Sequence, residues 1–271
     1  MWEYIGIFFA GFTVSAFGTV IGFGGGVFMV PLLTLVFHFP IQLAIGCVIL
    51  ALMPSALIST IHNSRRGLID FPVGILLEIP TIGGTVLGAW LTSYVPTWQL
   101  EILFSAMVIV TAITMLRRKD GGFPSRFRIL KTLNNVPPRI VRETPNGTYR
   151  MSGITITLFG LISGTIAGLF GIGGGFIKGP IMVLGFGMPA RIAAPTALFM
   201  IVITSSVGSV SHYLLGHIQW KSGLFLVVAF TLGSLFGNRR ARTIKEKTLV
   251  QYIAWGLFGA GVAMAISTIL L

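Results

Sequence analysis

Two short glycine clusters contain the residues of this chain that are best suited to bind an anion. Each cluster reads Gly-Xaa-Gly-Gly-Gly, the first at residues 22–26 and the second at residues 171–175. Consecutive glycines leave their backbone N–H groups uncovered, and a helix that begins directly after them adds a partial positive charge. The clusters therefore predict two anion-binding turns. One alternative stays open, because small residues also let membrane helices pack closely.

The predicted roles within the clusters differ by position. The expected anion-binding glycines are Gly24, Gly25, Gly26, Gly173, Gly174 and Gly175. The expected structural residues are Gly22 and Gly171, together with the prolines that follow each cluster, Pro31 and Pro180. Neither cluster is followed by Lys-Ser or Lys-Thr, so neither predicts a nucleotide-binding loop.

Two charged residues lie inside apolar stretches. Lys178 follows the second cluster, and Glu78 lies well away from the ends of its apolar run. An unpaired charge inside a membrane is expensive, so both side chains are candidates for function. Lys178 is expected either to neutralise a bound anion or to pair with a carboxylate. Glu78 is expected either to exchange protons as a coupling group or to be the partner of a buried lysine or arginine.

Hydroxyl groups could complete an anion site on the helices that follow Pro40 and Pro189. Thr196 and Ser205 are the two that we expect to face the glycine clusters. In membrane helices, however, hydroxyls more often bond to their own backbone. The two readings stay open at this point.

Histidine and cysteine predict no catalytic or metal chemistry. His62 and His212 lie near the ends of apolar segments, where histidine is more often an interfacial residue than a proton carrier. The single cysteine, Cys47, excludes an internal disulfide. No grouping of histidine, cysteine and carboxylates has the spacing of a nucleophile–base pair or a metal site, so we expect no enzyme, no metal and no cofactor.

The composition is that of an integral membrane protein. Hydrophobic residues make up 54% of the chain, charged residues 10%, and the mean hydropathy is +0.90. The formal net charge of +12 could suggest nucleic acid, but the basic residues are gathered in short segments between apolar runs. The charge is therefore an orientation signal, and we expect no nucleic-acid partner.

The apolar segments define the elements that must position these residues. They are residues 4–37, 41–61, 70–94, 99–116, 151–186, 189–215, 220–238 and 248–271. A helix needs about 20 residues to cross a bilayer, so the first and fifth segments are too long for one span and too short for two. Each is expected to form a spanning helix and a re-entrant half-helix, broken at the glycine cluster. Pro31 and Pro180 are expected at the start of the half-helices, where proline is tolerated.

The chain has two matching halves. An offset of 149 residues aligns the glycine clusters and, without a gap, also pairs Pro40 with Pro189 and Gly84 with Gly233. The predicted organisation is a first transmembrane repeat at 1–116, a basic cytoplasmic linker at 117–150 and a second repeat at 151–271. Gly/Pro breaks at matching points of two repeats are typical of a binding site in a transporter.

The distribution of positive charge favours inverted repeats. If each long segment enters and leaves on one face, then the 117–150 linker, the basic 239–247 loop, Arg65-Arg66 and Arg191 all lie in the cytoplasm. His38, residues 94–101, residues 217–221 and both termini would then lie outside. The predicted fold is thus an all-α polytopic bundle. Each repeat has a spanning helix, a re-entrant half-helix and three further spans.

These features resemble the TauE/SafE family, the sulfite exporter or toluene-sulfonate-uptake superfamily. The resemblance rests on the doubled Gly-Xaa-Gly-Gly-Gly-Xaa4-Pro motif, the prolines nine residues after each motif, the duplicated halves and the basic linker. It covers essentially the whole chain apart from the linker. It implies a prokaryotic carrier of the cytoplasmic (inner) membrane that works without ATP on a small sulfur-containing anion such as sulfite, sulfoacetate or a related organosulfonate.

The expected function is therefore export of such an anion by a secondary transporter. Alternatives that stay open are an importer of the same substrates and a passive anion channel, with an intramembrane enzyme as a more distant third. The expected partners are the small anion and the lipid bilayer, and a homodimer is left open.

Overall fold

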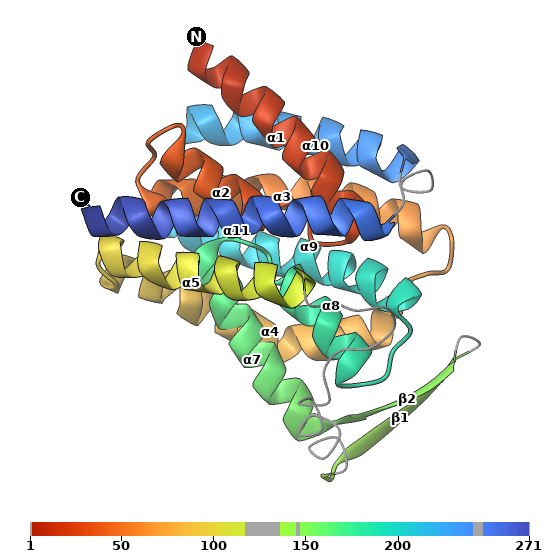
Figure 1. Cartoon of the computed structure of the whole chain (residues 1–271). Coiled ribbons are helices and arrows are strands. Elements are labelled where there is room, and N and C mark those ends of the chain that lie inside the picture. The colour runs from red at the N-terminus through yellow and green to blue at the C-terminus, as the bar shows by residue number, and fades with distance from the viewer. Residues whose placement is uncertain (1, 117–135, 145–146, 241–245, 271) are drawn as a thin grey trace.

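The computed structural model describes residues 2–116, 136–144, 147–240 and 246–270 (Figure 1). In the first half of the chain the helices are α1 (Trp2–Ile21), α2 (Gly26–Leu35), α3 (Ile41–Ser64), α4 (Phe71–Tyr94) and α5 (Thr97–Leu116). A hairpin of β1 (Arg139–Thr144) and β2 (Gly147–Ser152) follows. The second half contains α7 (Gly153–Phe170), α8 (Gly175–Leu184), α9 (Ala190–Leu214), α10 (Trp220–Arg240) and α11 (Glu246–Leu270).

The helices have the length and surface of a membrane bundle. Within the described residues, seven helices are long and apolar enough to cross a membrane. Large apolar side chains are exposed on the outside of the bundle, among them Ile79, Val110 and Trp255. Such a surface requires an apolar solvent, so the chain is a polytopic membrane protein.

Each over-long apolar segment forms a long helix followed by a short one. The breaks lie at the glycine clusters, between α1 and α2 and between α7 and α8. The predicted position of the prolines is wrong. The short helices begin at Gly26 and Gly175, so Pro31 and Pro180 lie inside them. The helices can begin earlier because Gly25 and Gly174, in the left-handed region, cap their N-termini.

Several helix bounds of the two halves differ by the same number of residues, 149. Adding 149 to the bounds of α2, residues 26 and 35, gives 175 and 184, which are the bounds of α8. The same sum takes the first residue of α3 to that of α9 and the first residue of α4 to that of α10. Pro40 and Pro189 are the N-cap residues of α3 and α9.

Close glycine contacts give the helix directions within two of the packed pairs. Gly84 of α4 lies against Leu161 and Gly88 against Thr165, so α4 and α7 run parallel. A methyl group added at Gly84 would lie 2.3 Å from the Leu161 carbonyl oxygen. The α1–α10 pair is built in the same way, with glycines of α10 against carbonyl oxygens of α1, and it also runs parallel.

The central helices α3 and α9 run antiparallel. Gly46, near the start of α3, lies against His217, just beyond the end of α9, whereas Gly208 lies against Ile49. The bundle therefore has two ends. The terminal end carries both chain termini and residues 215–219, and the linker end carries the hairpin and the loops that follow α3 and α8. Figure 1 shows the two labelled termini on one side of the bundle and the hairpin on the other.

The β-hairpin was not expected from the sequence, which predicted only a linker at 117–150. Residues 117–135 and 241–245 lie outside the described residues, and with them several of the basic positions that favoured inversion. Tyr149 of the hairpin is buried, and its hydroxyl donates to Asp70, the N-cap residue of α4. The backbone N–H of Arg150 donates to the carbonyl of Phe186 after α8. The hairpin is thus fastened to the linker end of the bundle.

Candidate functional site

Six of the cluster glycines have left-handed backbone conformations. In the first cluster φ is +87° at Gly22, +77° at Gly24 and +93° at Gly25. The corresponding glycines of the second cluster have φ values of +66°, +69° and +71°. Other residues adopt these values at a cost, so this shape of the turn depends on glycine.

The two clusters meet in the middle of the bundle. A methyl group added at Gly26 would lie 3.2 Å from the Cα atom of Ile172, and one added at Gly175 would lie 3.5 Å from the Gly22 carbonyl oxygen. Leu52 of α3 and Ile201 of α9 pack against the outer surfaces of the clusters. All the glycines of both clusters are buried. Close packing, the alternative function of these glycines, therefore has direct support.

The first cluster directs several backbone donors toward its own helix. The N–H groups of Gly22, Phe23 and Gly24 all point to the carbonyl oxygen of Gly18, at 3.1, 2.9 and 3.1 Å. An anion at this cluster would have to replace those contacts. In this conformation these three donors are thus committed to the protein.

The two charged residues form a buried pair. The Lys178 ammonium donates to the Glu78 carboxylate, and the two side chains are 3% and 2% exposed. Thr204 joins them: its Oγ1 lies 2.6 Å from Lys178 Nζ and 3.0 Å from Glu78 Oε2. The contact links α8, α4 and α9. Lys178 therefore has the carboxylate partner that was one of its two expected roles, and its aliphatic chain lies against Gly174.

The two predicted hydroxyl ligands have other partners. Thr196 Oγ1 accepts a hydrogen bond from the Asp70 N–H at 3.1 Å, at the start of α4. Ser205 donates to the carbonyl of Ile201 in its own helix at 2.6 Å. The structure does not bring either hydroxyl together with the cluster donors, and their assignment as ligands remains a prediction.

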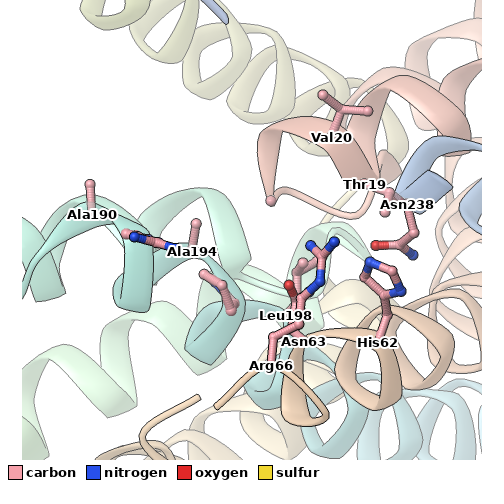
Figure 2. Close-up of a pocket in the computed structure, with 12 residues that line it drawn as sticks. Thr19, Val20, His62, Asn63, Arg66, Ala190, Ala194, Leu198 and Asn238 are labelled. Atoms are coloured by element: carbon pink, nitrogen blue, oxygen red, sulfur yellow. The ribbon is translucent and has the colours of Figure 1, made fainter. Parts of the chain in front are cut away.

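A cavity of about 350 Å³ opens at the linker end and extends inward to Gly22. Its walls come from the ends of α1, α3 and α10 and the start of α9. Figure 2 shows the side chains of Thr19, His62, Arg66 and Asn238 grouped around this space. The full lining is Thr19, Val20, Gly22, His62, Asn63, Arg66, Ala190, Arg191, Ala194, Pro195, Leu198 and Asn238.

The cavity is polar and positively charged. Arg66 and Arg191 both line it, and none of the described residues that line it is acidic. Thr19 is 5% exposed, and its hydroxyl oxygen has no hydrogen-bond partner among the described residues. Two guanidinium groups and an unpartnered hydroxyl can donate to a small oxoanion.

Sequence reasoning did not identify these lining residues as a site. It used Arg66 and Arg191 only as orientation signals. The signal present in the sequence is that both arginines lie next to helix ends on the face assigned to the cytoplasm. The sequence does not show that helix packing leaves a cavity between Arg66 and Arg191. The described residues contain no group of three or more His, Cys, Asp or Glu side chains that could hold a metal ion.

Comparison with known proteins places the chain among membrane transporters. The family model described as "Sulfite exporter TauE/SafE" matches residues 7–264. The chain is 27% identical over 254 residues to "Probable membrane transporter protein YunE" of Bacillus subtilis, a match that covers 89% of both chains. It is also 27% identical over 226 residues to "Probable membrane transporter protein YdhB" of the same bacterium, covering 82% of this chain and 85% of the relative.

A plant relative matches over a shorter region. "Sulfite exporter TauE/SafE family protein 3" of Arabidopsis thaliana is 37% identical over 86 residues, which are 32% of this chain and 18% of the plant protein. No solved structure matches the chain. The family match over nearly the whole length shows that this chain belongs to the TauE/SafE sulfite exporter family.

Proposed function

We propose that this protein is a secondary transporter that exports a small sulfur-containing anion across the cytoplasmic membrane of a prokaryote. Sulfite, sulfoacetate and related organosulfonates form the substrate class. The observation that carries the proposal is the cavity with two arginines, which leads from the linker end to the first glycine cluster. Its volume of about 350 Å³ suits a small anion.

The linker end would face the cytoplasm. Arg65, Arg66, Arg191 and Arg239 lie at this end, and cytoplasmic loops carry an excess of positive charge. The terminal end would then face outside. In this orientation the cavity receives its anion from the cytoplasm, which agrees with export.

We also propose that the halves are inverted repeats. Three observations support this: the difference of 149 between several matching helix bounds, the antiparallel course of α3 and α9, and the exchange of packing partners. The α4–α7 contact of Gly84 with Leu161 has its counterpart in the α1–α10 contact of Gly233 with Phe12. Transporters with such repeats rock one part against another around a central site.

In this mechanism the arginines gather the anion and the glycine clusters form the hinge region. Arg66 and Arg191 would attract the anion from the cytoplasm and neutralise it in the cavity. The anion would then move toward the clusters as the two halves change their relative tilt. Lys178 and Glu78 compensate each other's charge, which favours a structural role for the pair over proton coupling.

Removing one cavity arginine tests the proposal. In vesicles loaded with sulfoacetate, Arg66→Gln is expected to raise the internal KM for efflux about tenfold or more, the effect of losing one charge-assisted hydrogen bond. Arg65→Gln is the matched control, since Arg65 adjoins Arg66 but does not line the cavity. Equal effects of the two substitutions would contradict a binding role for the cavity.

Counterflow in the same vesicles separates a carrier from the passive channel. A carrier accumulates labelled sulfoacetate against its gradient when unlabelled anion flows the other way, and a channel does not.

Reporter fusions test the orientation. A C-terminal alkaline phosphatase should be active and a C-terminal green fluorescent protein dark, because phosphatase folds outside the cytoplasm. The opposite pattern would rule out inverted repeats with external termini. A fusion placed after residue 130 should behave in the reverse way.

A further inference from the structure

The terminal end holds a chain of hydrogen bonds built on two histidines. His212 Nε2 lies 2.8 Å from the Gly168 carbonyl oxygen, and His212 Nδ1 lies 3.0 Å from His217 Nδ1. A carbonyl can only accept, so His212 Nε2 carries a proton. With a neutral His212 ring, its Nδ1 accepts from His217, whose Nε2 then faces the Ser93 hydroxyl at 3.5 Å. The chain therefore joins α4, α7, α9 and the 215–219 segment.

The 215–219 segment lies directly on the first turns of α3. A methyl group added at Gly46 would lie 1.9 Å from the His217 carbonyl oxygen, so the absence of a side chain at Gly46 permits this contact. The neighbouring Cys47 thiol donates to the carbonyl of Gln219 at 3.5 Å. Gly46 is buried and Cys47 is fully buried. This end of the bundle is thus closed by backbone contact.

The same positions at the linker end surround the open cavity. Several residues that line the cavity correspond, by the offset of 149, to residues of the closed region. The pairs are Thr19 and Gly168, Gly22 and Gly171, Asn63 and His212, and Pro195 and Gly46. Leu68, the counterpart of His217, does not line the cavity. Matched positions therefore form an open cavity at one end and a sealed contact at the other.

We propose that residues 215–219 are the outer gate of the anion pathway. We further propose that His212, once released from His217, binds the anion in the outward-facing state. This inference rests on the proposed transport function. Asn63 lines the inner cavity, and its counterpart His212 would line the outer one, where an imidazole N–H can donate to an oxoanion oxygen.

The outer site would bind the same anion with less positive charge. The counterparts of Arg66 and Arg191 are Leu215 and Gln42, which are neutral. His212 would therefore be the principal donor of the outer site. An anion released outside would meet weaker electrostatic attraction than an anion that enters from the cytoplasm.

The native Cys47 reports whether the gate opens. It is the single cysteine of the chain, and it lies beneath the 215–219 segment. In intact cells a membrane-impermeant methanethiosulfonate reagent should label wild-type Cys47 slowly. Gly46→Ala, which places a methyl group against the His217 carbonyl, should increase the labelling rate at least tenfold.

Two further variants test whether faster labelling of Cys47 comes from opening of the gate or from misfolding. His217→Ala removes the histidine contact without adding a side chain at Gly46, and it should also increase labelling. Gly83→Ala is the matched control, because a methyl group there meets nothing within 4 Å. Unchanged Cys47 labelling in both Gly46→Ala and His217→Ala proteins that reach the membrane would overturn the gate.

The role of His212 is tested by comparing the two faces of the membrane. In sealed vesicles of known orientation, His212→Ala should raise the external KM for sulfoacetate at least tenfold and leave the internal KM unchanged. His212→Gln keeps an N–H donor and should recover part of the affinity. Equal changes in both KM values would show a structural role and overturn the binding assignment.

The labelling test is independent of substrate identity. If wild-type protein moves no sulfur anion but Cys47 labelling still responds to Gly46→Ala, the proposed function fails and the gate stands. If sulfoacetate is transported and labelling never responds, the gate fails and the function stands.

Discussion

The half-helices α2 and α8 have the same shape but are held in different ways. Both follow a glycine cluster, both have a left-handed glycine as N-cap, and both contain a proline at the sixth position. In α8, Lys178 binds Glu78 of α4 and Thr204 of α9. At the corresponding position α2 has Met29, which is fully buried in the hydrophobic core.

The residues of the first half that correspond to the partners of Lys178 are uncharged. The counterparts of Glu78 and Thr204 in the first half are Val227 and Ser55. The hydroxyl of Ser55 shares a hydrogen bond with that of Ser15 of α1, at 3.2 Å. A short helix after a glycine cluster therefore forms with glycines and apolar packing and does not require a buried charge. The ion pair is a separate property of the second half.

The largest expected effect comes from breaking that ion pair. Lys178→Met or Glu78→Val alone leaves one uncompensated buried charge and should lower the free energy of unfolding by about 3–5 kcal/mol. The double variant reproduces the residues of the first half and should restore most of the stability. Melting temperatures of the detergent-purified proteins measure this.

Anion binding by the double variant then decides the role of Lys178. If the pair is structural, sulfoacetate should stabilise the double variant as much as it stabilises wild type. A stable double variant that no longer responds to sulfoacetate would place Lys178 in the anion site. If the double variant does not recover stability, then the uncharged residues found in the first half cannot replace the ion pair in the second half.

The next largest effect is expected at Gly25 and Gly174, the N-cap glycines of α2 and α8. Gly25→Ala should destabilise the protein by about 2 kcal/mol or more, because φ is +93° and the new methyl group would lie 2.9 Å from the Val14 carbonyl oxygen. Gly174→Ala should cost less, since φ is +71° and the nearest atom is the Ala167 methyl carbon at 3.2 Å. Denaturation of the two variants in parallel measures the difference.

Bulkier residues at these positions should stop transport. Gly25→Leu and Gly174→Leu are expected to abolish sulfoacetate efflux at normal protein levels. Gly74→Ala is the control, because its contact is the Phe199 ring at 2.8 Å, a side chain that can turn away. Equal transport losses in all three variants would mean that these glycines serve helix packing alone.

The smallest expected effect concerns the hairpin at the linker end of the bundle. Tyr149→Phe removes the hydroxyl that donates to Asp70 and should lower the free energy of unfolding by about 1 kcal/mol. Burial, followed by the Asp70 contact, raises the pKa of Tyr149 above its ordinary value of 10.0. The unfolded chain therefore loses this proton first as the pH rises.

This gives the sign of a pH dependence. The stability that Tyr149 contributes is present below pH 10.0 and is lost as the pH rises above it. The melting temperature of wild type should fall more steeply above this pH than that of Tyr149→Phe. Parallel curves for the two proteins would show that the Tyr149 hydroxyl contributes nothing to holding the hairpin on the bundle.

Local patterns were sufficient for the membrane class and the helices. The expected apolar ranges correspond closely to the helices, and the breaks at the two glycine clusters lie where the excess length predicted them. The 149-residue offset, read from glycines and prolines, also recurs in the helix bounds. These features depend on hydropathy and backbone freedom, which are properties of short segments. The expected position of Pro31 and Pro180 at the start of the short helices was wrong, because the hydropathy of these segments does not tell where each short helix begins.

Tertiary packing decided the contacts on which function depends. Lys178 and Glu78 are 100 residues apart in the sequence. Their charges alone left two possibilities for each residue: Lys178 could bind an anion and Glu78 could exchange protons, or the two could pair with each other. The cavity that Arg66 lines exists because four helix ends leave space between them, and the corresponding space at Gly46 is closed. Thr196 binds Asp70 because α9 presents it to α4. Such contacts follow from the relative positions of distant helices, which no local pattern of residues encodes.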